Sequence, residues 1–188
     1  MHNILSRKCE TEYFDTSKPD SYVQLGDCII KYMSNFNLKD MTPVILCIGT
    51  DRATGDCLGP LVGEQLFNYN HNYMVFGNLS SPVHALNIRE TIFQIKNTLR
   101  NPFVIAVDAS LGLSPHIGSV TVSNCPIYPG KGVHKKLPAI GDISITGIVN
   151  LSGQSPSVLQ NTRLFTVMQL ADCISEALKY SINYFEDF

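Results

Sequence analysis

Uninterrupted apolar runs are the strongest strand signals along the chain. Val44–Ile48 and Pro102–Val107 contain no alternating polar positions, a pattern typical of parallel strands that are covered on both faces. Ser119–Ser123 and Ile143–Val149 alternate between polar and apolar residues, which predicts half-exposed strands. Tyr73–Phe76 gives a weaker strand signal of the same kind.

Apolar residues recur at helical spacing in four further segments. The expected helices cover residues 21–36, 58–68, 87–99 and 163–184. Asn87 is expected to cap the third of them, with Glu90 completing a capping box. Residues 1–19 lack this periodicity, so we expect them to form a loosely held N-terminal arm.

Strands and helices alternate over the first part of the chain, which is typical of a parallel sheet with right-handed crossovers. The later, alternating strands are expected to extend this sheet as a mixed edge. We therefore predict one α/β domain over residues 1–188, with a three-layer α/β/α architecture and a mostly parallel central sheet.

Composition narrows the classes of partner. The 188 residues are 44% hydrophobic and 16% charged, as in globular proteins with an ordinary core. A net charge of −2 gives no electrostatic basis for binding nucleic acid or an anionic membrane. No apolar stretch reaches the roughly 20 residues that span a bilayer, and the first residues lack a signal-peptide core. We expect a cytoplasmic protein, and the oligomeric state stays open.

The cysteines show no recognisable spacing. There are six, without a CxxC or CxxH pair: Cys9, Cys28, Cys47, Cys57, Cys125 and Cys173. A chain of this length with its own core and no export signal is expected to keep them reduced, mostly as small core residues. We therefore predict no disulfide framework and no zinc site.

An aspartate follows each of the two buried runs. Asp56 lies in the glycine-rich loop after the first run, and Asp108 comes directly after the second. Parallel strands deliver their carboxyl ends to one edge of a sheet, where α/β proteins bind ligands. Two adjacent carboxyl groups can share a proton, so that one activates water and the other protonates a leaving group.

Other roles for these acids remain open. The pair could hold a divalent metal. Asp56 could instead cap the following helix, and Asp108 could fix a turn by accepting a bond from the backbone of Ser110 or Leu111. Asp51, in the same loop as Asp56, is expected to be a solvated acid.

Further polar residues are candidates for substrate contacts. Lys131 lies between two glycines in a basic loop and could bind a carboxylate or an acidic peptide, unless it is a solvated turn residue. Thr146 and Asn150 share one face of the predicted strand over 143–149 and could bond to substrate backbone, or belong to an ordinary edge strand. Cys57 is a weaker candidate nucleophile near a helix start, and no GxSxG motif supports a serine nucleophile.

Three motifs occur in an order that resembles a known enzyme family. They are GTDRATGDCLGPLVG (49–63), VIAVDAS (104–110) and YPGKGVHKKLPAIGDISITGIVN (128–150). Together they resemble the germination protease of spore-forming bacteria, an atypical aspartic peptidase of the hydrogenase-maturation-protease fold that degrades small acid-soluble spore proteins. This likeness covers roughly residues 43–150. The whole chain is similar to the short, germination-protease-like sporulation proteins of the YyaC type.

The resemblance implies roles for particular residues. Asp56 and Asp108 match the two catalytic aspartates of the germination protease. His84 falls in the loop that this family carries after its second strand, and is expected to contact substrate with Lys131. Cys57 stands where the hydrogenase maturation proteases carry a metal-binding glutamate, which argues against nickel recognition, although Asp108 matches one of their metal ligands. We expect neither a metal nor another cofactor.

These observations lead to one expected function and two alternatives. The expectation is a sporulation-associated aspartic endopeptidase, a hydrolase whose partner is a small acid-soluble spore protein or another peptide. A non-catalytic protein that binds a peptide in the same cleft is the alternative from a different class. A metal-dependent hydrolase is a weaker alternative.

Overall fold

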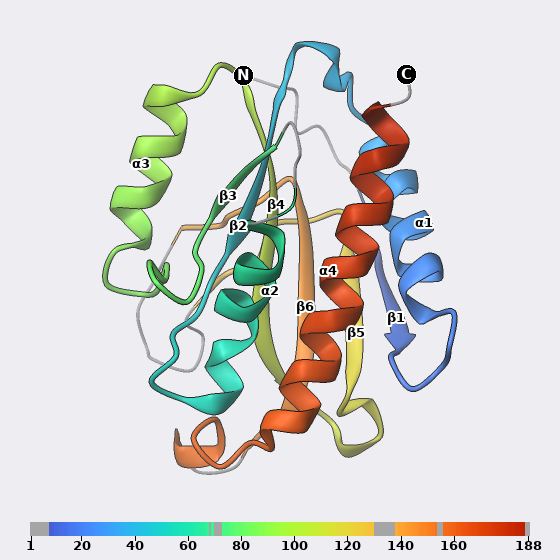
Figure 1. Cartoon of the computed structure of the whole chain (residues 1–188), viewed down its shortest axis with the longest axis vertical. Helices are drawn as coiled ribbons and strands as arrows, with labels where there is room; N and C mark the ends of the chain where they lie inside the picture. Colours follow the sequence, from blue (N-terminus) through green and yellow to red (C-terminus); the bar gives the residue numbers. More distant parts are fainter. Residues whose placement is uncertain (1–7, 68, 70–72, 130–137, 154–155, 187–188) are drawn as a thin grey trace.

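A six-stranded sheet forms the centre of the structure (Figure 1), a computed structural model that describes residues 8–67, 69, 73–129, 138–153 and 156–186. The strands are β1 (Thr11–Asp15), β2 (Thr42–Cys47), β3 (Met74–Phe76), β4 (Pro102–Gly112), β5 (Ser119–Ser123) and β6 (Ile143–Leu151). The helices are α1 (Ser21–Met33), α2 (Leu58–Phe67), α3 (Ile88–Thr98) and α4 (Leu164–Glu186).

The sheet is mostly parallel, as predicted. Its strand order is β1-β5-β6-β4-β2-β3. The four strands β3, β2, β4 and β6 run parallel to one another, whereas β5 and β1 add an antiparallel edge. The expected side-by-side placement of the two buried runs is confirmed, because β2 pairs with β4 along its whole length.

Helices cover both faces, which confirms the three-layer architecture. Alternate residues of β2 divide between two cores. Ile45 and Cys47 belong to the core that contains residues of α1, α2 and α4, whereas Val44 and Leu46 belong to a smaller core with residues of α3. In Figure 1, α2 and α4 lie in front of the sheet and α3 lies at its side.

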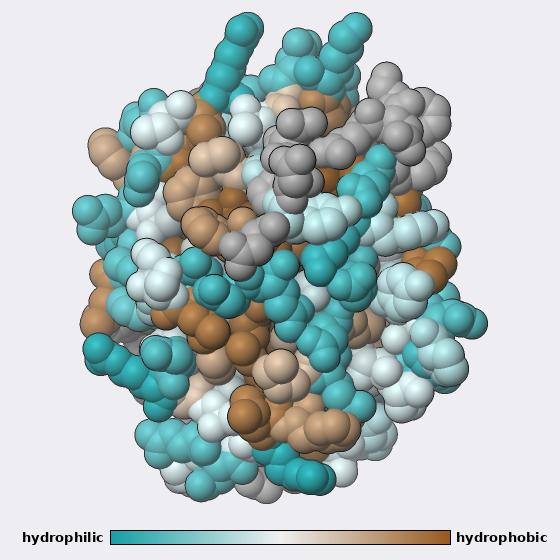
Figure 2. Space-filling view, in the orientation of Figure 1, coloured by the Kyte–Doolittle hydropathy of each residue, from teal (hydrophilic) through white to brown (hydrophobic). Residues whose placement is uncertain are grey.

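The outward side of the helical layer is mixed in character. Figure 2 shows hydrophilic side chains interspersed with hydrophobic ones, the latter grouped mainly toward the lower part of this face. Of the described helices, none is long and apolar enough to cross a membrane.

The sheet differs from the prediction at four strands. Residues expected as a loose arm form β1, which pairs with β5 from Thr11↔Ser123 to Asp15↔Ser119. All five residues of β5 and six of the nine residues of β6 are buried rather than half-exposed, because each of these strands lies between two others. β4 continues to Gly112, beyond the predicted end at Val107, because β6 pairs with its second half.

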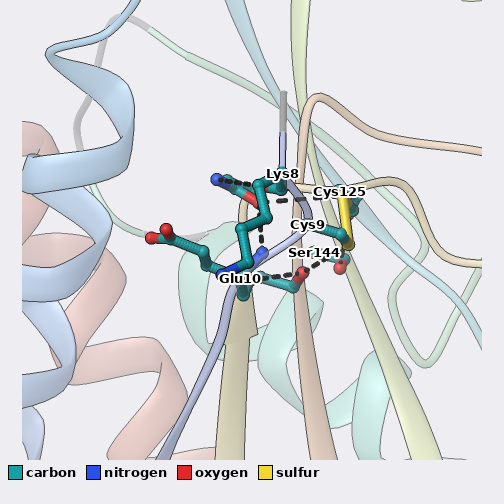
Figure 3. Close-up of a disulfide and its surroundings, with 7 residues drawn as sticks. Lys8, Cys9, Glu10, Cys125 and Ser144 are labelled. Atoms are coloured by element: carbon teal, nitrogen blue, oxygen red, sulfur yellow. Dashed lines mark hydrogen bonds between the residues drawn. A yellow bond between two sulfur atoms is a disulfide. The ribbon is translucent and has the colours of Figure 1, made fainter. Parts of the chain in front are cut away.

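The cysteines were predicted only in part. Cys28 and Cys47 are buried in the core as expected. The expectation that the cysteines stay reduced is wrong for Cys9 and Cys125, which form a disulfide between Cα atoms 5.7 Å apart (Figure 3). Their separation of 116 residues gives no spacing pattern in the sequence, and only the pairing of β1 with β5 brings them together.

Hydrogen bonds reinforce this junction. The Glu10 backbone N–H donates to Asn124 Oδ1 at 2.9 Å, and Ser144 Oγ donates to the Cys125 carbonyl at 2.7 Å (Figure 3). The segment that precedes β1 is therefore fixed to the segment that follows β5, both by a covalent bond and by polar contacts.

Truncating Phe103 is expected to remove a large part of the stability. Its ring is fully buried and packs edge-on against Phe36 with centroids 4.8 Å apart, so Phe103→Ala should lower the free energy of unfolding by about 3–5 kcal/mol. Phe93, which is 70% exposed, offers a matched control in which the same change should stay within about 0.5 kcal/mol. Urea unfolding measures both, and equal losses would contradict this assignment of the core.

Candidate active site

The loop that carries Asp56 is shaped by close backbone contacts after β2. A Cβ on Gly49, whose φ is +147°, would overlap the Asp56 carbonyl oxygen, and a Cβ on Gly59 would overlap the backbone of Ile48. The Thr50 N–H donates to the Asp56 carbonyl at 3.0 Å and closes the loop. Asp56 itself lies in the short 3-10 helix η2 (Thr54–Cys57), which leads directly into α2 at the lower end of the sheet in Figure 1.

The Asp56 side chain does not act as a helix cap. Within the described part of the chain, its carboxylate accepts no hydrogen bond from a backbone N–H of η2 or α2. The alternative role as a cap therefore receives no support. The carboxylate is half-buried and remains available to a ligand.

Asp108 lies within β4 rather than at its end. The ladder between β2 and β4 stops at Cys47↔Val107, so Asp108 is the first residue of β4 beyond the end of β2, and it pairs with Thr146 of β6. Its Oδ1 accepts the Ala109 backbone N–H at 2.8 Å. The expected alternative bonds to Ser110 or Leu111 are not formed.

The two carboxyl groups influence each other electrostatically. Burial, followed by the negative charge of Asp56, raises the pKa of Asp108 to about 8, although the hydrogen bond from the Ala109 N–H acts in the opposite direction. Burial also raises the pKa of Asp56, where a positive charge on His84 opposes the effect. Of the two carboxyl groups, Asp108 is therefore the one that keeps its proton to higher pH.

His84 is held next to this pair by the loop that precedes α3. Val83 forms a parallel bridge with Ile48, and its carbonyl accepts the Gly49 N–H at 2.8 Å, which places the loop beside the end of β2. The His84 Nδ1 accepts the Leu86 N–H at 3.3 Å, so the hydrogen-bond pattern assigns a neutral ring proton to Nε2.

Asn87 occupies the N-cap position of α3, as predicted, but its side chain holds the His84 loop instead of capping the helix. Its Oδ1 accepts the His84 backbone N–H at 2.8 Å, and its Nδ2 donates to the Pro82 carbonyl at 3.0 Å. Its side chain makes no capping bond to α3. Sequence reasoning missed this positioning role because Asn suits both helix caps and loop bonds.

The Cys57 thiol, Asp51 and the other candidate metal ligands that the structure describes do not support a cysteine nucleophile or a metal site. Burial, followed by the charges of Asp51 and Asp56, raises the pKa of the Cys57 thiol, which disfavours the nucleophilic thiolate. Asp51 is exposed, as predicted. Among the residues that the structure describes, no group of three or more His, Cys, Asp and Glu side chains is arranged to hold a metal ion.

The predicted substrate-binding residues fall in different places. Thr146 lies beside Asp108 in register and hydrogen-bonds Thr121 of β5 at 2.7 Å between the two hydroxyl oxygens. The Asn150 amide donates to Thr162 Oγ1 at 3.2 Å and to the Val158 carbonyl at 3.4 Å, so it fixes the segment before α4. Lys131 lies outside the described residues. A substrate contact for any of them stays a prediction.

A family model described as "Protein of unknown function (DUF1256)" matches residues 13–177, which include Asp56, His84 and Asp108. The chain belongs to this family. It is 51% identical over 137 residues to "Uncharacterized protein YyaC" of Bacillus subtilis (strain 168), an alignment that covers 72% of this chain and 67% of that relative.

Proteases are more distant relatives of this DUF1256 member. Germination proteases of Halalkalibacterium halodurans and Bacillus licheniformis are 26% and 27% identical to it over 163 residues. These alignments cover 78% of this chain but only 41% and 42% of the proteases, so the chain spans about two fifths of their length. The similarity to germination proteases is confirmed, which relates the chain to peptidases.

A solved structure confirms the fold. The [NiFe] hydrogenase maturation protease HycI of Thermococcus kodakarensis KOD1 matches with a TM-score of 0.50, over 81% of this chain and 99% of its own. At 18% sequence identity, this likeness establishes the α/β fold and carries nothing about metal binding or substrate.

Replacing Asp108 by Asn is expected to flatten the pH dependence of stability between about pH 5 and pH 8. The folded protein, in which the pKa of Asp108 is about 8 against an ordinary 3.8, keeps a proton that the unfolded chain releases. The free energy of unfolding of the wild type should therefore fall as the pH rises toward 8, and this loss should be smaller in Asp108→Asn. Urea unfolding across the range measures the two slopes, and equal slopes would contradict the raised pKa.

Proposed function

We propose that this chain is a peptidase in which Asp56 and Asp108 activate one water molecule. The observation that carries the proposal is the difference in pKa between two neighbouring carboxyl groups. The pKa of Asp108 is raised to about 8, whereas a positive charge on His84 would oppose the increase in the pKa of Asp56. Near neutral pH one group is therefore an acid and the other a base, and hydrolysis of an amide needs both. The sequence similarity to germination proteases supports the same reaction.

The proposed reaction returns both groups to their starting state. The Asp56 carboxylate takes a proton from water while the water oxygen adds to the peptide carbonyl carbon. The Asp108 carboxyl then donates its proton to the nitrogen as the C–N bond breaks, and the tetrahedral oxyanion re-forms a carbonyl. A proton transfer from Asp56 to Asp108 restores the pair.

His84 serves as a positioning residue in this scheme. The ring is neutral while its Nδ1 accepts the Leu86 N–H, and a positive charge on it would favour the ionised form of Asp56 that the proposed base requires. Asn87 holds the His84 loop in place through both ends of its amide. The pKa values of the two carboxyl groups are separated mainly by burial, which acts on both groups and raises the pKa of Asp108 to about 8.

Small acid-soluble spore proteins are the proposed substrates. The motifs around Asp56 and Asp108 resemble those of the germination protease, and two germination proteases are relatives of the chain. Because the chain spans about two fifths of their length, neither substrate nor activity follows from the relationship alone. A role inside the sporulating cell belongs to the same proposal.

Asp56→Asn and Asp108→Asn are each expected to lower the rate of cleavage by about 10²–10⁴-fold, the usual contribution of a general acid or base. The measurement is an intact-mass time course of a purified small acid-soluble spore protein with wild-type or variant enzyme. Asp51→Asn is the matched control, since Asp51 is exposed in the same loop and should tolerate the change with little effect.

The same experiment separates the other two functions. Loss of cleavage on chelation, with recovery on adding one divalent ion, would favour a metal-dependent hydrolase. Retained peptide binding without fragments from the wild type, and equal binding by both Asn variants, would favour a non-catalytic peptide-binding protein. Full activity of Asp56→Asn would refute the proposed base.

The pH profile offers an independent prediction. The proposed acid is the protonated Asp108, so kcat/KM should fall about tenfold per pH unit above a pKa near 8. On the acidic side, kcat/KM should fall where Asp56 becomes protonated, above the ordinary value of 3.8 because burial raises its pKa. Initial rates at fixed ionic strength measure the profile, and a rate that keeps rising well above pH 8 would exclude Asp108 as the acid.

A further inference from the structure

A transverse row of side chains connects Asp108 with the edge of the sheet. Asp108 pairs with Thr146 on β6, Thr146 with Thr121 on β5, and Thr121 with Tyr13 on β1. Neighbouring strands lie about 4.8 Å apart, so the row places a chain of polar groups directly beside the proposed acid.

These four residues lie on the face away from α1, α2 and α4. Gly147, next to Thr146, faces Leu58 of α2 and Leu170 of α4. Val120, next to Thr121, belongs to the core that those helices cover. Because side chains alternate along a strand, Thr146 and Thr121 point to the opposite face.

The neighbouring row of side chains on the same face, formed by Ser144 and Ser123, is covered by other segments of the chain. Ser144 and Ser123 pair across β6 and β5. Ser144 donates to the Cys125 carbonyl, and Ser123 donates to the Glu10 carbonyl at 2.9 Å. Segments on either side of the Cys9–Cys125 disulfide therefore cover that row and leave the one beside Asp108 open.

A hollow of about 290 Å³ lies over the open row. Its floor carries the hydroxyl groups of Ser110, Thr146 and Thr121, and Tyr13, Leu113 and Ile148 contribute to its walls. Ser110 is two residues beyond Asp108 on the same face of β4, and its Oγ lies 3.4 Å from Thr146 Oγ1. The hollow thus adjoins the carboxyl pair without containing it.

The lining has no formally acidic group and no lysine or arginine among the described residues. His116 packs its ring against Tyr13, with centroids 5.0 Å apart. A charged side chain entering such a hollow would lose hydration without gaining an ionic partner, which is unfavourable. An uncharged side chain could contact the apolar walls and still satisfy a polar end on the hydroxyl floor.

We propose that this hollow is a specificity subsite for an uncharged side chain of a peptide substrate. The inference rests on the proposed peptidase function and names the class of residue that the site accepts. An extended peptide advances about 3.3 Å per residue, and Thr146 places the near side of the hollow one strand spacing, about 4.8 Å, from Asp108. The side chain it receives therefore belongs to a residue within about two positions of the cleaved bond.

The test introduces a positive or a negative charge at one residue in the wall of the hollow. Leu113 is 66% exposed, so Leu113→Lys and Leu113→Glu should fold normally while adding opposite charges to the hollow. The probes are synthetic peptides that span the first bond cut in a small acid-soluble spore protein. Each of the two residues on either side of that bond is replaced in turn by Leu, Gln, Glu or Lys.

At one of these positions the wild type is expected to cleave the Leu and Gln peptides about tenfold or more faster than the Glu and Lys peptides. Leu113→Lys should raise kcat/KM for the Glu peptide relative to the Lys peptide by about tenfold, and Leu113→Glu should do the reverse. Phe165, which is 61% exposed on α4, provides matched Lys and Glu controls on the other face, and these should leave the ranking unchanged.

The experiment distinguishes failure of the subsite alone from failure of the peptidase proposal. Cleavage with the same ranking of peptides in the wild type and both Leu113 variants overturns the subsite and leaves the peptidase proposal intact. A wild type that prefers a charged residue at all four positions also overturns the subsite alone. Absence of any cleavage of the spore protein by the wild type overturns the peptidase proposal and the subsite together.

Discussion

Burial of the Asp108 carboxyl beside Asp56 is the interaction on which the proposed chemistry of this chain depends. In water both groups would be ionised at neutral pH and would act alike. Burial favours the protonated form of Asp108, and the charge of Asp56 adds to the effect. The sheet creates these conditions because β4 carries Asp108 past the end of β2, where the chain turns away and η2 brings Asp56 back.

Backbone contacts, more than side-chain contacts, hold that arrangement. Gly49 lies against the Asp56 carbonyl and Gly59 against the backbone of Ile48, with no space for a Cβ at either position. The helix that follows η2 can therefore begin directly on the end of β2, and Asp56 cannot move away without breaking this packing. Glycine at these points serves the close approach of two backbone segments, and the position of a carboxylate depends on it.

Local patterns sufficed to predict the edge of the sheet that carries the candidate site. Apolar runs signal buried strands, and parallel strands bring their carboxyl ends together, so the approach of Asp56 and Asp108 followed from the sequence. The N-terminal edge did not, because β1 is five residues long and pairs with β5 more than a hundred residues away. Asn87 illustrates a different limit, since its preference for caps competes with loop bonds of equal chemical quality, and only the position of His84 decides between them.

The part that local patterns missed is also the part that shapes the second face of the sheet. The helices α1, α2 and α4 cover a face rich in Val and Ile, whereas the opposite face of β6 and β5 carries Ser144, Thr146, Thr121 and Ser123. A sheet face built from hydroxyl groups gains little from burying an apolar helix. Such a face is better covered by a segment that has hydrogen-bonding groups of its own. The carbonyl groups of Glu10 and Cys125 already accept hydrogen bonds from part of this face. An extended peptide offers the same carbonyl groups, so the contacts of Glu10 with Ser123 and of Cys125 with Ser144 provide a model for how the backbone of the proposed substrate would lie along the adjoining open row.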